Sequence, residues 1–94
     1  MFTWLNKQGV KSDAGFIVQR VDRFVIEYRD EDCKISVDVE AGRTDDGRQC
    51  LNISRNAFEK WDGSSVRSPP DEQARLLANF TAALEFQGLA VIAY

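Results

Sequence analysis

The longest periodic pattern of apolar positions lies between Ser68 and Gly88. Two prolines and two acidic residues open this segment, and both suit the first turn of a helix, where proline loses no hydrogen bond and the dipole favours negative charge. Gly88 can end the helix because glycine adopts the left-handed conformation without a steric penalty. The pattern predicts one helix over residues 69–87, capped by the Ser68 side chain. Its apolar face consists of Leu76, Leu77, Phe80, Ala83 and Leu84.

Residues 15–41 alternate between apolar and polar, which is typical of strands with one buried face. A hairpin that turns at residues 22–23 places Ile17 opposite Tyr28, and a second hairpin that turns at residues 31–32 continues the same face. The expected buried face consists of Ile17, Val21, Phe24, Ile26, Tyr28, Ile35, Val37 and Val39. The expected reverse face consists of Val25, Glu27, Arg29, Lys34, Ser36, Asp38, Glu40, Cys50, Asn52 and Ser54.

Shorter segments flank this region. Residues 1–13 predict an edge strand and a turn, and we expect Phe86, which lies off the helical stripe, to pack against Phe2 or Trp4. Residues 49–54 predict a further strand in a hairpin with the preceding one, with Leu51 opposite Val39 and Cys50 beside Glu40.

Residues 55–67 fit either a short strand or a helical turn, and the almost entirely apolar residues 89–94 predict a buried or central last strand. The predicted fold is therefore α+β. One domain over residues 1–94 contains an antiparallel sheet of about five strands, with the 69–87 helix on one face, followed by a final strand.

Composition narrows the chemistry. The 94 residues include no histidine, which removes the commonest general base, the usual catalytic triads and most zinc or copper sites. The predicted register puts Cys33 and Cys50 roughly 20 Å apart, so we expect two free thiols without a base to activate them. Neither acidic turn supplies the glycine and glutamate of a calcium-binding loop. We therefore expect no enzyme, no cofactor and no metal site.

No apolar run approaches the ~20 residues of a membrane span, and no secretion signal is recognisable. The expected location is the cytoplasm, with reduced cysteines and no membrane contact.

The formal net charge is −3, which disfavours a nucleic-acid partner and suits a basic one. Residues 27–46 carry eight acidic and three basic side chains, so this segment is more negative than the whole chain. It fits either an ordinary solvated surface with acidic turns or a docking patch for a basic protein. The candidate docking residues are Glu27, Asp30, Glu31, Asp32, Asp38, Glu40, Asp45 and Asp46.

Several stretches together resemble a small family of bacterial immunity proteins from polymorphic toxin systems: WLNKQGV (4–10), GF (15–16), FVIEY (24–28) and ALEF (83–86). Proteins of this kind are mostly β, are encoded beside a toxin gene and neutralise the toxin by binding it. The resemblance implies a non-catalytic binding protein that occludes a basic toxin domain. It assigns no contact residues, and it leaves open a homodimer.

Other functions make different demands on the fold. A single-stranded nucleic-acid-binding module would need Arg20, Arg29, Lys34 and Arg55 to cluster beside exposed aromatic side chains. An enzyme would need a deep pocket that holds a carboxylate with a strongly raised pKa. Another small protein-interaction module would need only the uncovered sheet face.

Overall fold

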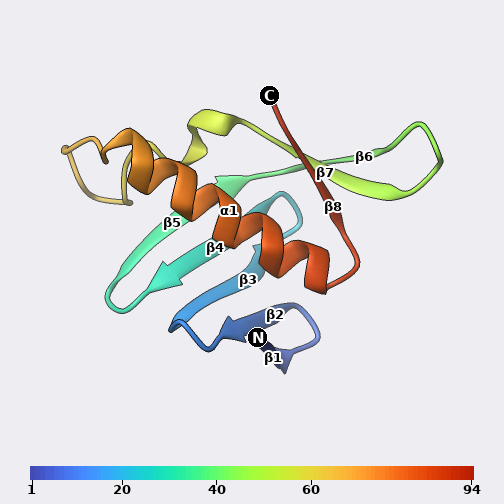
Figure 1. Cartoon of the computed structure of the whole chain (residues 1–94), viewed down its shortest axis with the longest axis horizontal. Helices are drawn as coiled ribbons and strands as arrows, with labels where there is room; N and C mark the ends of the chain where they lie inside the picture. The colour runs from blue at the N-terminus through green and yellow to red at the C-terminus, as the bar shows by residue number, and fades with distance from the viewer.

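Two β-sheets share one core with a single α-helix in the computed structural model, which describes residues 1–94 (Figure 1). The first sheet is antiparallel and has five strands in chain order: β1 (Phe2–Asn6), β2 (Gly9–Ser12), β3 (Phe16–Asp22), β4 (Val25–Asp30) and β5 (Cys33–Asp38). The second sheet comprises β6 (Glu40–Arg43), β7 (Gln49–Ile53) and β8 (Ala90–Ala93). A 3₁₀ helix, η1 (Arg55–Phe58), and the helix α1 (Pro70–Phe86) connect β7 to β8. The α+β prediction is confirmed, with the second sheet as an addition.

The helix α1 is one residue shorter at each end than the predicted 69–87, and its C-terminal end forms as expected. Gly88 has a φ of 86°, and its amide donates to the Glu85 carbonyl at 3.0 Å while the Leu89 amide donates to the Leu84 carbonyl at 3.0 Å. These two bonds form a Schellman motif, which satisfies carbonyls that the helix itself leaves free. No helix in the structure is long and apolar enough to cross a membrane.

The start of α1 differs from the prediction, because Ser68 does not cap it with its side chain. Ser68 is buried, and its amide donates to the Glu59 carbonyl at 2.8 Å. Its own carbonyl accepts from the Gln73 side-chain amide at 2.7 Å. The serine therefore joins the helix to the preceding loop through its backbone.

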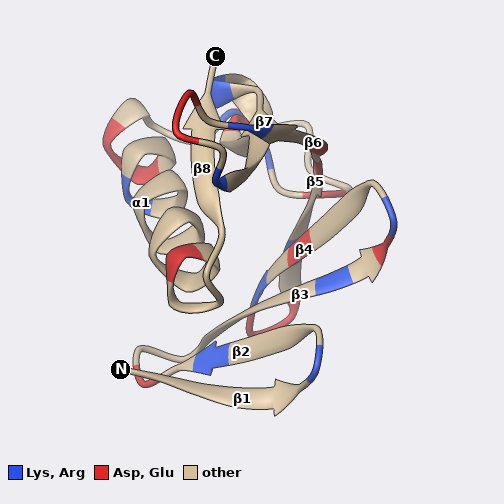
Figure 2. Ribbon diagram, turned by 90° about the vertical axis from the view of Figure 1, so that its right-hand side faces the viewer, with Lys and Arg blue, Asp and Glu red and all other residues tan.

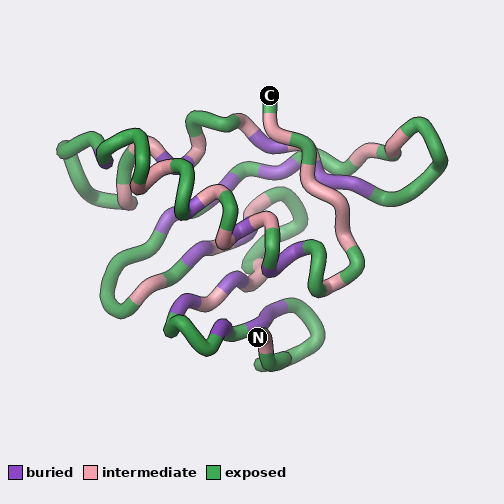
Figure 3. Tube along the Cα trace, in the orientation of Figure 1, coloured by how far each residue is buried: buried purple, intermediate pink, exposed green.

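The predicted apolar face of α1 lies against the first sheet. Leu76, Phe80, Ala83 and Leu84 are buried, and Leu77 is half-buried. Figure 3 shows buried positions recurring along β3, β4 and β5 and along α1. The core also contains aromatic pairs, and Phe58 of η1 lies 5.3 Å from Phe80 between ring centroids.

The register of the second hairpin is confirmed, with Ile26 opposite Val37 and Tyr28 opposite Ile35. The first hairpin was predicted one residue out of register, because Tyr28 lies opposite Val18 and not Ile17. The buried residues of β3 are Phe16 and Val18, whereas Ile17 is half-buried on the reverse face and Val21 and Phe24 are exposed.

Two differences account for this error: the turn lies at residues 23–24 and not at 22–23, and a bulge lies between Arg20 and Asp22. The bulge inserts one extra residue before the turn, so the side chains of β3 change face. The observed register brings Phe16 into the core, where its ring stacks on Tyr28 at 5.2 Å between centroids.

The strand β7 was also predicted with the wrong partner. Leu51 lies opposite Ala41 of β6, and not opposite Val39, because the chain leaves the first sheet after Asp38. Cys50 consequently lies opposite Gly42 and is 2% exposed, so it is not on the reverse face of the first sheet.

The prediction of a central last strand was wrong as well. The strand β8 pairs only with β7, in parallel, and forms an edge of the second sheet. A parallel pair requires a long crossover connection, which η1 and α1 provide.

The N-terminal hairpin packs as predicted. The Phe86 ring lies 5.5 Å from that of Phe2 and 5.9 Å from that of Trp4, between centroids. This cluster fixes β1 and β2 against the C-terminal end of α1.

Residues 55–67 contain the helical turn that was one of the two alternatives, followed by a loop along β5. The Asp62 amide donates to the Lys34 carbonyl at 2.8 Å. Its carboxylate accepts from the Ser36 hydroxyl at 2.7 Å and from the Ser36 amide at 3.1 Å. The loop thus satisfies backbone groups of an edge strand that would otherwise be open to another chain.

Tyr28 occupies the centre of the core and is fully buried. Its hydroxyl accepts a hydrogen bond from the Asn79 side-chain amide of α1 at 3.2 Å. Burial raises the pKa of the Tyr28 phenol above its ordinary value of 10.0, because the phenolate would lose its hydration. The neutral phenol is therefore the form that the fold stabilises.

Replacing Phe80 by alanine should lower the free energy of unfolding by about 3–5 kcal/mol, because the side chain is fully buried and leaves a cavity. Phe86→Ala is the control, since Phe86 is 44% exposed and should lose only about 1 kcal/mol. Urea unfolding followed by circular dichroism measures both. Equal losses in the two variants would contradict the placement of the helical stripe.

Stability should fall as the pH rises above 10, because the unfolded chain then releases the Tyr28 proton while the folded chain retains it. Below that pH both states keep the proton and the contribution is complete. Tyr28→Phe should be less sensitive to this rise in pH, by up to about 1.4 kcal/mol for each pH unit. Urea unfolding of both proteins at pH 8 and pH 10.5 measures the difference, and parallel losses would refute it.

Candidate functional site

The reverse face of the first sheet carries no covering element. Figure 2 shows α1 on one side of β3 and β4 and no segment on the other. Arg29, Lys34 and Asp38 are exposed on this reverse face, while Ile17 and Val25 are half-buried between their polar neighbours. The expected free sheet face is therefore present.

The centre of this face is not acidic. The Glu27 carboxylate lies 2.9 Å from the Arg29 Nε and 3.7 Å from the Lys34 Nζ. The Glu27 side chain is only 15% exposed, so its neighbours screen it from solvent. Two cations and one anion thus form a compact cluster, and of the predicted docking residues only Asp38 adds unpaired negative charge to the face.

The eight predicted docking residues do not form one patch. Asp30, Glu31 and Asp32 lie at the β4–β5 turn, whereas Asp45 and Asp46 lie in the β6–β7 turn. Figure 1 shows these two turns at opposite ends of the molecule. Glu27 and Asp38 lie on the reverse face, and Glu40 begins β6.

The β6–β7 turn uses one of its acids internally. The Asp46 carboxylate accepts from the Thr44 hydroxyl and from the Arg48 amide. The hydrogen bond from Thr44, followed by the one from Arg48, lowers the pKa of Asp46. This carboxylate therefore stabilises its own turn and has less capacity for a partner.

The β4–β5 turn has a different environment, because it forms one wall of a hollow. The hollow has a volume of about 310 Å³ and is lined by Asp30, Glu31, Cys33, Trp61, Glu72 and Arg75. Here the first turns of α1 approach the end of β4. Three carboxylates face one guanidinium, and Arg75 reaches only Glu72, at 3.7 Å.

Trp61 is the aromatic component of this hollow. It is half-buried, packs against the core, and its ring lies 6.2 Å from that of Tyr28. The neighbouring Asp62 holds its segment against β5, as described above. An anchored indole beside carboxylates can accept a cationic side chain on its face.

Sequence reasoning placed Asp30 and Glu31 in the docking patch but did not include Glu72. Glu72 lies about forty positions from Asp30 and Glu31 along the chain. An acidic residue in the first turn of a helix is also expected from the helix dipole, so Glu72 gave no separate sign of a binding role. In the sequence, Trp61 precedes an Asp-Gly turn, which predicts a core residue, or an interface residue if the side chain is exposed. The half-buried position that it occupies serves both roles.

The arrangement suits recognition of a cation. The carboxylates of the hollow offer charged hydrogen-bond acceptors to a lysine or arginine. No group of three or more Asp, Glu, Cys or His side chains lies close enough to hold a metal ion. Tyr28, whose pKa is raised by burial, lies in the core behind Trp61, and Asp46, whose pKa is lowered by hydrogen bonds, lies in the β6–β7 turn.

The four basic residues required for a nucleic-acid surface lie on different parts of the molecule. Arg29 and Lys34 are on the reverse face, both beside Glu27. Arg20 pairs with Ile26 and therefore lies on the opposite face, and Arg55 begins η1. No continuous basic surface with stacked aromatic residues results.

Comparison with known proteins assigns no family. No protein-family model matches the chain, and neither the curated proteins nor the solved structures gave a significant match. The resemblance to immunity proteins therefore stays a prediction from the sequence.

Proposed function

We propose that this chain is a cytoplasmic, non-catalytic binding protein that neutralises a bacterial toxin by occluding it, as an immunity protein does. The observation that supports this proposal best is the hollow lined by Asp30, Glu31, Glu72 and Trp61. A lysine or arginine of a basic toxin domain would enter it, and the surrounding surface would cover the toxin's active site.

The hollow is built on elements that are already ordered. Asp30 ends a strand, Glu72 lies in the first turn of α1, and Asp62 ties the Trp61 segment to β5 through three hydrogen bonds. Fixed elements lose little conformational freedom on association, so more of the contact energy contributes to affinity.

The charge of this region also favours a basic partner. Asp32 adds a further carboxylate beside Asp30 and Glu31, and none of these three has an ion-pair partner within 4 Å. Unpaired surface charges accelerate encounter with an oppositely charged protein and orient it. The reverse sheet face offers a weaker field, because Glu27 is already compensated by Arg29 and Lys34.

The double variant Asp30→Lys with Glu72→Lys should weaken toxin binding at least about tenfold, because it reverses the charge of the hollow. If the adjacent gene encodes a large secreted protein, its C-terminal domain is the partner to test. Isothermal titration calorimetry measures the affinity, and growth of bacteria that co-express the toxin domain measures protection. The association rate of the unmodified pair should also fall as the salt concentration rises.

The matched control is Asp45→Lys with Glu85→Lys, which changes the net charge equally but lies away from the hollow. It should retain nearly full affinity. Equal weakening in both double variants would show that only net charge matters, and the hollow would be rejected. Weakening confined to Asp38→Lys would instead move the contact to the reverse sheet face.

A further inference from the structure

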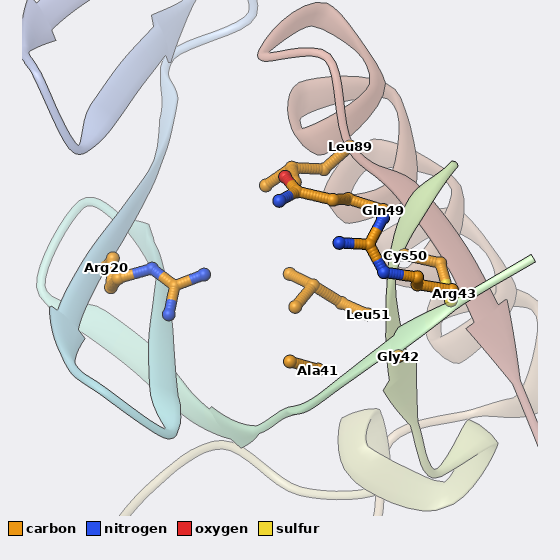
Figure 4. Close-up of a pocket in the computed structure, with 8 residues that line it drawn as sticks. All are labelled: Arg20, Ala41, Gly42, Arg43, Gln49, Cys50, Leu51 and Leu89. Carbon is orange, nitrogen blue, oxygen red and sulfur yellow. The ribbon is translucent and has the colours of Figure 1, made fainter. Parts of the chain in front are cut away.

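A second concave region lies where the two sheets diverge, and its character is opposite to that of the acidic hollow. This inter-sheet cleft has a volume of about 390 Å³. In Figure 4 the Arg20 side chain extends into it from the first sheet, and Ala41, Leu51 and Gln49 approach from the second. Its remaining lining residues are Gly42, Arg43, Cys50 and Leu89.

The two guanidinium groups of the cleft have no acidic partner. No carboxylate lies within 4 Å of Arg20 or Arg43. Each makes one side-chain hydrogen bond to a backbone carbonyl: Arg20 donates to Arg23 at 2.9 Å and Arg43 to Gly47 at 3.0 Å. A guanidinium has five N–H donors, so most of the donors remain available.

The basic character continues into a neighbouring cavity of about 280 Å³, which shares Arg20 and Leu89 with the cleft and adds Lys7 and Trp4. No acidic residue lines either cavity. In a chain with a net charge of −3, this combination concentrates positive charge in one concave place.

The wall opposite Arg20 is apolar. Leu51 is 4% exposed and Leu89 is half-buried, with the buried Cys50 beside them. The fold creates this contrast, because the bulged register of β3 places Arg20 on the helix side next to Ile26.

We propose that the inter-sheet cleft binds a small organic anion, namely a carboxylate or phosphate joined to an apolar body. Arg20 and Arg43 would hold the anionic group by charge-assisted hydrogen bonds, and Leu51 and Leu89 would contact the apolar part. The volume lies within the range of small-molecule sites. This site is separate from the acidic hollow and does not depend on the proposed toxin-neutralising function.

Titration of the isotope-labelled protein, followed by amide resonances in NMR spectra, tests the site. The probes are phenyl phosphate and benzoate, which carry both features, inorganic phosphate, which has only the charge, and benzyl alcohol, which has only the ring. The first two should saturate and shift the amides of Gly42, Cys50 and Leu51. Inorganic phosphate and benzyl alcohol should each bind at least about tenfold more weakly, because one class of contact is missing.

The variants Arg20→Met and Arg43→Met should each weaken phenyl phosphate binding by about ten- to a hundredfold, since each removes charge-assisted hydrogen bonds. Arg55→Met is the matched control, because Arg55 is exposed outside the cleft, and it should bind normally. Arg43→Lys keeps the charge and should bind with intermediate affinity. Spectra without ligand establish that each variant is folded.

Three results would overturn the proposal: no saturable shifts with either aromatic anion, shifts that persist in the folded Arg20→Met and Arg43→Met variants, or equal binding of inorganic phosphate and phenyl phosphate. The last would reduce the cleft to a general attraction for anions. Failure of this site leaves the toxin-binding proposal unaffected, because the acidic hollow shares no residue with it.

Discussion

The burial of one helical stripe against one sheet face determines most of this structure. Leu76, Phe80 and Leu84 meet the side chains of β3, β4 and β5 in a layer from which water is excluded. A domain of this size has only one such layer, so its stability depends on the fit of a few large side chains. The hydrogen bond from Asn79 to the Tyr28 hydroxyl satisfies the one polar atom that this layer places at its centre.

The ends of the same helix explain where the concave surfaces lie. Near its N-terminal end, Glu72 and Arg75 approach the β4–β5 turn and form the acidic hollow. Beyond its C-terminal end, Leu89 lines both basic cavities. The division of the strands into two sheets separates these regions further, because β6 and β7 leave the plane of β5 after Asp38. A chain of modest net charge thereby presents two surfaces of opposite sign.

The sequence predicted the elements better than their exact pairing. The helix and the second hairpin were predicted correctly because only one placement of their apolar residues gives a continuous buried face. The first hairpin was not, since Phe16, Ile17 and Val18 are consecutive apolar residues and either alternation buries apolar side chains. The register of β3 is decided by contacts with Tyr28, on the next strand, and with α1, far along the chain. Neither contact can be read from β3 itself.

The candidate site shows the same limit. A local excess of acidic residues was visible, but the compensation of Glu27 depends on neighbours along and across strands. Arg29 lies two positions from Glu27 and so shares its face, a relation that strand periodicity could have revealed. Glu72 and the inter-sheet cleft depend on tertiary contacts, which no local pattern records.

Asp62 is hydrogen-bonded to Lys34 and Ser36 of the edge strand β5. Another chain can therefore add a strand to the first sheet only beside β1. One border is occupied by the chain's own loop, and β1 forms the other. A second copy that paired through β1 would complete a two-fold assembly and leave no border for a third. The loop that carries Trp61 therefore leaves β1 as the border through which a second copy could extend this sheet.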